Sequence, residues 1–459
     1  MYKVDFKKPI HIHFIGIGGI SMSGLAEILI KEGFTVSGSD VKPSALTTRL
    51  SSKGATIVFS QTAENITDTI DLIVYTAAVH DDNEEYAAAK KSGIPLLSRA
   101  ELLGQLMNNY QVPIAVAGTH GKTTTTSMLS HILLAGDLDP TISVGGILNS
   151  IGGNIRVGGG EYFVTEACEY TNSFLHFFPK ISVILNIDED HLDFFKDLDD
   201  IYDSFLAFAK LLPTDGNLVI NNSIPRVSLF KEALGNRLIT YGLTEDCRYF
   251  AEAITYDSYG CPSFDLYIDG QKIDRLTLAV TGEHNVENAL ASIAVSELIG
   301  IPLEEVKKGL LSFGGTNRRF EKKGEKDGVV IIDDYAHHPT EIRATLGAAK
   351  AYPHREIWCI FQPHTYTRTK ALFHEFARAL ALADHVILTD IYAARETDNL
   401  GVSAEGLAAE IKVHGSDAYY LPSFAEIEKF CLENCKKGDL LITMGAGDVV
   451  SIGESILES

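Results

Sequence analysis

The chain alternates between short apolar runs and longer segments in which apolar residues recur every three or four positions. The runs predict buried strands and the longer segments predict helices, so the expected fold belongs to the α/β class. Near the N-terminus this order predicts a small Rossmann-like domain over residues 1–108. Its strands are expected at residues 11–14, 35–39, 57–59 and 72–75, and its first helix at residues 20–32.

A second segment, residues 109–316, opens on an apolar strand at 114–117 and continues into a helix at 122–134. Its strands are apolar throughout, which is typical of a parallel sheet covered on both faces. The remaining elements are expected as strands at residues 162–165, 181–186 and 218–220 and a helix at 286–299.

The pair Gly314 and Gly315 predicts a hinge into a third segment, residues 317–459. Strands are expected there at residues 329–332, 357–361, 386–389 and 440–443. The sequence therefore predicts three α/β domains: a Rossmann-like domain, a central parallel-sheet domain of the P-loop type, and a second Rossmann-like domain. A chain of 459 residues agrees with this, since one core seldom serves more than about 250–300 residues.

Composition excludes several classes of function. The formal net charge of −22 disfavours nucleic acid as a partner, and no apolar run approaches the ~18 residues of a membrane span. Six cysteines without a CxxC spacing indicate reduced thiols and no zinc site. A charged start without an export signal predicts a cytoplasmic protein. The oligomeric state is left open between a monomer and a homodimer.

The strand at 114–117 runs into a glycine-rich loop and then a helix, the context in which backbone N–H groups bind phosphates. Lysine supplies a mobile positive charge and threonine a hydroxyl for Mg²⁺. Only two residues separate the glycines, so the common GxxxxGK[ST] spacing is absent, and the alternative is a glycine-rich turn with an incidental lysine. The expected ATP phosphate loop consists of Gly118, Thr119, His120, Gly121, Lys122, Thr123 and Thr124.

Acidic residues follow two further strands of the central segment. Glu166 and Glu169 come after the strand at 162–165, and residues 188–193 place a histidine, His191, among acidic side chains. Mg²⁺ prefers oxygen ligands, and α/β sheets bind ligands at the carboxyl ends of their strands. These residues are candidates for a metal site; a solvated acidic turn is the alternative for residues 188–193.

At this point the sequence resembles the Mur ligases of bacterial peptidoglycan synthesis over nearly its whole length. The motifs that carry the resemblance are residues 16–24 (GIGGISMSG), 118–124 (GTHGKTT), 166–169 (EACE), 190–193 (DHLD), 282–288 (GEHNVEN), 317–321 (NRRFE), 333–339 (DDYAHHP) and 361–368 (FQPHTYTR). The resemblance implies that the first domain binds a UDP-sugar, the second ATP, and the third the amino acid as it closes the site.

Residue roles follow from the resemblance. It implies catalytic roles for Lys122, Glu166 and His191 and two Mg²⁺ ions held by Thr123, Glu166 and His191. Besides the phosphate loop, it implies that Asn285, Asn288, Arg319 and Asp334 bind ATP. Without the resemblance, the two asparagines would be interpreted as a helix cap and a polar surface site.

The remaining implied contacts are with the two other substrates. The UDP-sugar would meet Gly16, Gly18, Gly19, Ser21 and Asp40. Ser21 stands where a dinucleotide fingerprint has its last glycine, so a UDP diphosphate is better supported than NAD. The substrate carboxylate or amino acid would meet Tyr335, His337, His338, His364 and Arg368, although single histidines in such loops are more often structural.

The branch of the family that joins L-alanine to the lactyl carboxylate of UDP-N-acetylmuramate fits best. Several relatives carry a carbamylated lysine in the helix after the DHxD motif, whereas residues 202–208 contain no lysine, as in the alanine-adding branch. The implied reaction proceeds through an acyl phosphate and releases ADP and phosphate. The alternatives are the tripeptide-recycling branch, a Rossmann oxidoreductase, which would leave the phosphate loop unused, and a regulatory NTPase, which would not need the third domain.

Overall fold

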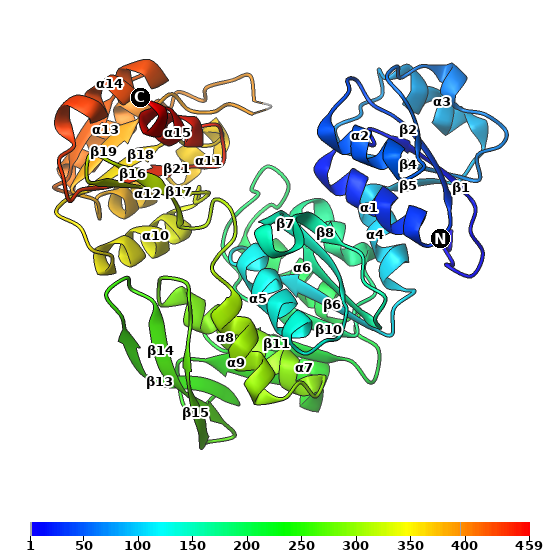
Figure 1. Cartoon of the computed structure of the whole chain (residues 1–459), viewed down its shortest axis with the longest axis horizontal. Helices are drawn as coiled ribbons and strands as arrows, with labels where there is room; N and C mark the ends of the chain where they lie inside the picture. Colours follow the sequence, from blue (N-terminus) through cyan, green and yellow to red (C-terminus); the bar gives the residue numbers. More distant parts are fainter. Residues whose placement is uncertain (1, 395) are drawn as a thin grey trace.

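The computed structural model describes residues 2–394 and 396–459, which form three α/β units along the chain (Figure 1). Each unit is built on its own sheet, of five, ten and six strands. The predicted fold class is therefore confirmed. The three sheets lie within the predicted ranges 1–108, 109–316 and 317–459. Residues 1 and 395, which fall in the first and third of these ranges, lie outside the described residues. The boundaries themselves stay predictions.

The first sheet is parallel throughout, in the order β3-β2-β1-β4-β5. The chain leaves β1 at the point where the strand order changes direction, which is where open α/β sheets bind ligands. The helices α1 to α4 follow β1, β2, β4 and β5. Bounds are β1 His11–Ile15, α1 Ile20–Lys31, β2 Thr35–Ser39, α2 Ala45–Ser52, β3 Thr56–Val58, β4 Leu72–Tyr75, α3 Glu84–Ser92, β5 Leu96–Ser98 and α4 Arg99–Met107.

The central sheet has the order β15-β14-β13-β12-β11-β10-β6-β9-β7-β8. Its parallel core is β6 Val112–Ala117, β7 Thr141–Leu148, β9 Tyr162–Ala167, β10 Ile181–Ile184, β11 Asn217–Asn221, β12 Leu238–Gly242 and β13 Tyr249–Tyr256. Antiparallel strands extend both ends: β8 Gly153–Arg156, β14 Pro262–Ile268 and β15 Gln271–Thr277. The predicted parallel sheet is therefore present as this core, to which the antiparallel strands are added. The edge strand β15 is mostly exposed and lacks an apolar run.

Five helices accompany this sheet: α5 Lys122–Ala135, α6 Leu198–Ala209, α7 Val227–Leu234, α8 His284–Leu298 and α9 Leu303–Ser312. Helices α5, α8 and α9 pack on one another. Their buried residues, such as Leu129, Leu290 and Leu310, share one core with strands β6, β9 and β10. The phosphate-loop helix is therefore fixed firmly between the sheet and α8.

The third sheet, in the order β16-β17-β21-β18-β19-β20, is parallel except for β16. Its strands are β16 Glu321–Lys326, β17 Val329–Asp334, β18 Ile357–Phe361, β19 His385–Leu388, β20 Asp417–Tyr420 and β21 Leu440–Met444. Its helices are α10 Pro339–Ala351, α11 Tyr366–Ala371, α12 Phe373–Leu380, α13 Ala404–Val413, α14 Phe424–Asn434 and α15 Val450–Glu458. Helix α10 lies on the side of this unit that faces the central one (Figure 1).

No helix in the described part of the chain is long and apolar enough to cross a bilayer.

Candidate active site

The phosphate loop joins β6 to α5 as predicted. Gly118 and Gly121 have φ angles of 143° and 82°, in the left-handed region that favours glycine. The amide of Asn186, just beyond β10, accepts a hydrogen bond from the backbone N–H of His120 at 2.7 Å and donates to its carbonyl at 3.1 Å. The loop is therefore held in one conformation by the neighbouring strand.

Lys122 is the first residue of α5 and turns back over the loop. Its ammonium donates to the carbonyl of Thr119 at 3.2 Å and to Glu169 Oε2 at 2.9 Å. Burial lowers the pKa of Lys122, but the Glu169 carboxylate more than offsets this and holds that pKa above its usual range. The lysine is thus a buried cation with a buried counter-ion, because Glu169 is only 2% exposed.

Thr123 and Glu166 each lie against one of two adjacent glycines in β7. Gly145 donates its backbone N–H to Glu166 Oε1. A Cβ on Gly145 would lie 2.7 Å from Glu166 Oε2, and one on Gly146 would lie 3.2 Å from Thr123 Cγ2. A hydroxyl and a carboxylate oxygen suit Mg²⁺, so the donor set fits the predicted ion. In the described part of the chain, no cluster of three or more His, Cys, Asp or Glu side chains is arranged to hold a metal.

His191 lies beside Glu169, the counter-ion of Lys122. Its Nε2 is 3.9 Å from Glu169 Oε1, and its ring packs on Tyr170 with centroids 4.5 Å apart. The backbone of His191 has φ of 54°, a strained conformation for a residue other than glycine. Local strain of this kind is common at functional sites.

Arg368, from α11 of the third unit, reaches the same cluster. Its guanidinium donates to Asp190 Oδ1 at 2.9 and 3.1 Å. Burial raises the pKa of Asp190, but the Arg368 charge outweighs it and lowers that pKa well below its usual range. Around this pair is a cavity of about 380 Å³, here called the His191 cavity, lined by Tyr170, Glu189, Asp190, His191, Leu192, Asp193, His364, Thr365, Thr367, Arg368, Ala371, Leu372, Ala394 and Glu396.

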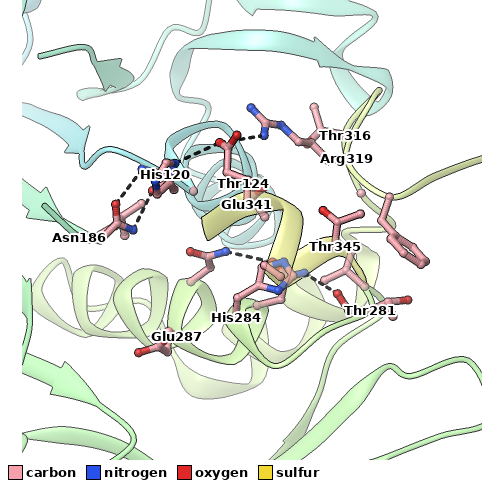
Figure 2. A pocket seen from close by; sticks show the side chains of 18 of the residues that line it. His120, Thr124, Asn186, Thr281, His284, Glu287, Thr316, Arg319, Glu341 and Thr345 are labelled. Carbon is pink, nitrogen blue, oxygen red and sulfur yellow. Dashed lines mark hydrogen bonds and ion pairs between the residues drawn. The ribbon is translucent and has the colours of Figure 1, made fainter. Parts of the chain in front are cut away.

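A second cavity, of about 330 Å³, lies between the central and third units and is here called the interdomain cavity (Figure 2). Of the residues expected to bind ATP, its lining contains His120, Gly121, Thr124, Asn285, Asn288, Arg319 and Asp334. Gly118, Thr119, Lys122 and Thr123 are not in that lining but belong to the same loop. Residues from three distant segments therefore meet at one site, as expected.

Asn285 and Asn288 are buried in the wall of the interdomain cavity. Asn288 accepts from Thr125 Oγ1 at 3.1 Å and donates to Asn285 Oδ1 at 3.0 Å, while Asn285 donates to the carbonyl of Thr281 at 2.8 Å. Both asparagines thus bind protein groups, linking α8 to the phosphate-loop helix, in addition to lining the cavity.

Asp334 ends β17 and accepts from the backbone N–H groups of Phe320 and Ala336, both at 2.8 Å. Burial raises the pKa of Asp334 to about 6, although Arg319 opposes the shift. The carboxyl group is therefore held against the linker that precedes the third sheet.

The five residues expected to bind the UDP-sugar lie together in the first unit, outside both cavities. Gly16 has φ of 86°, and the N–H of Gly18 donates to Asp40 Oδ2 at 2.7 Å. The Ser21 hydroxyl accepts from Arg99 at 3.2 Å, and Gly19 caps α1. The glycine loop, the start of α1 and the end of β2 thus form one surface.

The third-unit candidates divide between two neighbourhoods. His364 and Arg368 line the His191 cavity, whereas the His338 ring packs at a tilt against His120, with ring centroids 4.6 Å apart, and its Nε2 is 3.1 Å from the Glu189 carbonyl. Tyr335 and His337 line neither cavity and pack edge to face on each other, with ring centroids 5.4 Å apart.

Sequence reasoning did not identify Asn186, Tyr170 or Glu341. Glu341 is in the first turn of α10, and its Oε1 lies 3.2 Å from His120 Nδ1. Its only sequence signal is its place two residues after the motif ending at Pro339, which does not reveal a contact with a different domain.

Comparison with known proteins identifies one family. Models described as "Mur ligase family, catalytic domain", "Mur ligase middle domain" and "Mur ligase, glutamate ligase domain" match residues 11–111, 116–296 and 318–447. The UDP-N-acetylmuramate–L-alanine ligases of Lachnospira eligens and Agathobacter rectalis are 59% and 58% identical, with 100% of each chain covered.

Solved structures give the same result. The UDP-N-acetylmuramate–alanine ligase of Thermotoga maritima superimposes with a TM-score of 0.80 at 32% identity, covering 98% of both chains. A murein peptide ligase from Psychrobacter arcticus superimposes with a TM-score of 0.69 at 27% identity, also over 98% of both chains. The chain therefore belongs to the Mur ligase family.

Proposed function

We propose that this chain uses ATP to join L-alanine to the lactyl carboxylate of UDP-N-acetylmuramate. The proposal is supported by relatives that are named UDP-N-acetylmuramate–L-alanine ligases. The observation that carries the proposal is that the phosphate loop, the cluster around His191 and the Arg368 segment meet around the buried ion pair of Lys122 and Glu169. We also propose that the domains meet at residues 108/109 and 316/317.

In this proposal, the base and ribose of ATP bind in the interdomain cavity and its phosphates bind on the phosphate loop. The volume of about 330 Å³ is within the roughly 300–1,000 Å³ of small-molecule sites. Asn285 and Asn288 form one wall for the base, and Asp334 and Arg319 face it from the third unit. When ATP binds, the Lys122 ammonium leaves the Glu169 carboxylate and contacts the β and γ phosphates instead.

Thr123, Glu166 and His191 are proposed to hold two Mg²⁺ ions. When bound, these ions neutralise charge on the transferred phosphoryl group and on the substrate carboxylate. The chain's own contribution is to fix Glu166 through the Gly145 N–H and His191 through Tyr170.

The reaction has two steps. A lactyl carboxylate oxygen attacks the γ-phosphorus, and ADP leaves, giving an acyl phosphate. The amine of L-alanine then attacks the carbonyl carbon, loses a proton and expels phosphate. Lys122 contributes electrostatic stabilisation, and the third unit, lying against the central one, excludes water from the acyl phosphate.

The His191 cavity is the proposed site of the amine. Arg368 is a candidate for holding the amino-acid carboxylate, since a guanidinium binds carboxylates through two hydrogen bonds. The guanidinium of Arg368 already donates to Asp190. Arg368 would therefore bind the amino-acid carboxylate either while it keeps this contact with Asp190 or after it releases it. His191 and the carboxylates beside it are the candidate acceptors of the amine proton.

The UDP-sugar is proposed to place its diphosphate on the loop at residues 16–19, where backbone N–H groups and the start of α1 favour anions. Asp40 would then exchange its contact with Gly18 for a ribose hydroxyl. ATP and a nucleotide sugar are cytoplasmic metabolites, so the chain is proposed to act in the cytoplasm, as a monomer or homodimer.

The second candidate is ligation of a tripeptide to the same sugar, because a peptide ligase shares the fold over 98% of both chains. The experiment is phosphate release from ATP and Mg²⁺ with UDP-N-acetylmuramate and either L-alanine, glycine, L-serine or L-Ala-γ-D-Glu-meso-diaminopimelate. Release that requires both the sugar and L-alanine supports the proposal. Release with the tripeptide replaces it by the second candidate, and release without sugar or amine excludes both.

A further inference from the structure

One side chain of the phosphate loop points away from the loop and toward the third unit. The backbone of His120 is bound to Asn186, which leaves the imidazole as the part of this residue available to other groups. Its Nε2 is 3.3 Å from Asp188 Oδ2 in the central unit, and its Nδ1 is 3.2 Å from Glu341 Oε1 in α10. The imidazole therefore bridges two carboxylates that belong to different domains.

Both partners carry charge at neutral pH. Burial lowers the pKa of His120, but Asp188 and Glu341 outweigh it and raise that pKa to about 9. Burial raises the pKa of Glu341, but His337, His120 and Arg319 together hold it well below its usual range. The His338 ring that packs against His120 stays neutral, since burial and the His120 charge lower its pKa to about 4. The contact is thus an ion pair shielded from water.

Glu341 connects this pair to other parts of the site. Its Oε2 accepts from the His337 N–H at 3.0 Å, and its Oε1 lies 3.9 Å from the Arg319 guanidinium. Figure 2 shows Glu341 between His120 and Arg319 at the edge of the interdomain cavity. The Glu341 carboxylate therefore contacts His120 of the phosphate loop, Arg319 of the linker and the backbone of His337.

This carboxylate meets the loop only when the third unit lies against the central one. We infer that the His120–Glu341 pair couples closure of the third domain to the placement of the phosphate loop and Arg319, so that the acyl phosphate is protected from water until the amine attacks. The inference rests on the proposed ligase function. Glu341 acts through His120 and Arg319 and is a positioning residue.

The test compares Glu341→Gln, His120→Asn and the double variant with the wild type, using Lys350→Gln as a control. Lys350 is an exposed residue of the same helix, α10. Two quantities are measured: kcat for ligation, and the ratio of ADP released to amide formed with saturating UDP-N-acetylmuramate, L-alanine and ATP. The ratio reports loss of acyl phosphate to water, which a merely destabilised but correctly closing enzyme would leave at one.

Each single variant should lower kcat about tenfold, within the range of coupling between sites, and raise the ratio above one. The KM for ATP should change less than kcat, and the double variant should be no worse than either single variant because both break one contact. A ratio of one in both single variants, or fully additive losses in kcat, would overturn the inference.

Thermal unfolding of each variant separates misfolding from uncoupling. If Glu341→Gln fails to fold, His120→Asn tests the same contact from the other side, and a ratio of one there overturns the inference. Failure of the wild type to form any amide would instead refute the proposed ligase function and leave the closure contact to be measured by small-angle scattering.

Discussion

At the scale of single residues, the site depends on buried charges that have defined partners. Lys122 is fixed by the Thr119 carbonyl and Glu169 in a space shaped for a single ammonium. A planar guanidinium presents its donors in a different geometry and is more weakly hydrated, so arginine does not replace lysine in such a space.

We predict that Lys122→Ala lowers kcat by about 10²–10³, the usual effect of removing one preorganised group that stabilises transition-state charge. Lys122→Arg should not restore activity to within tenfold of the wild type. The measurement is phosphate release at saturating ATP. Lys196→Ala, whose side chain is 86% exposed, is the matched control and should behave as the wild type. An arginine variant with near wild-type kcat would show that only the charge matters.

A second prediction concerns the metal. Glu166→Gln keeps the hydrogen bond from Gly145 but replaces an anionic oxygen ligand by a neutral amide, which Mg²⁺ binds more weakly. The midpoint of a Mg²⁺ titration of activity should therefore move to higher concentration. Glu161→Gln, at an exposed position just before the same strand, should leave the midpoint unchanged. An unchanged midpoint and kcat in Glu166→Gln would remove this residue from the metal site.

The sequence predicted these residues because the loop and the acidic clusters follow apolar strands, and strand ends meet at one edge of a parallel sheet. It did not predict Glu341 or Asn186. Their importance depends on contacts with His120 across domains or between strands, and no local periodicity encodes such contacts.

At the scale of elements, the strand-loop-helix unit was predicted closely, and β18 Ile357–Phe361 has the bounds that its apolar run predicts. The strands β13 to β15 were not predicted, since their exposed positions at the sheet end break the apolar pattern. Apolar runs mark strands that are buried on both faces, whereas an edge strand is defined by its neighbour.

The turn into α5 gives a prediction at this scale. Gly121 has φ of 82°, and a Cβ there would lie 2.9 Å from Asn288 Oδ1. Gly121→Ala should lower the free energy of unfolding by about 1–2 kcal/mol for the left-handed backbone and also disturb the link between α5 and α8.

Gly93→Ala is its matched control, since Gly93 has φ of 77° and a methyl group added there would meet no atom within 4 Å. Both variants should lose stability in denaturant unfolding, but only Gly121→Ala should raise the KM for ATP. A KM for ATP that rises equally in both variants would contradict a role for the contact with Asn288.

At the scale of the whole molecule, the central and third units meet around both cavities, and their arrangement is held by contacts that the sequence could not reveal. Arg368 binds Asp190, His338 meets the Glu189 carbonyl, and His120 binds Glu341. The number and order of domains followed from strand-helix alternation, but the way they meet depends on side chains far apart in the chain.

The closed arrangement should depend on pH. The pKa of His120 is raised to about 9 from an ordinary value near 6.5, so its contribution is complete below about 6.5 and is lost as pH rises through about 9. The groups facing it are Asp188, Glu341 and the neutral His338 ring. The radius of gyration should therefore increase between pH 8 and pH 10 in the wild type and not in His120→Asn. An equal increase in both would assign the opening to other groups.

The most direct measurement is the fate of ¹⁸O from the lactyl carboxylate of UDP-N-acetylmuramate when the protein is incubated with ATP, Mg²⁺ and L-alanine. Ligation through an acyl phosphate transfers one carboxylate oxygen to the released phosphate as the amide forms. The expected products are the alanyl amide and phosphate that carries one ¹⁸O atom. Phosphate without ¹⁸O, or ATP consumption without the amide, would contradict it.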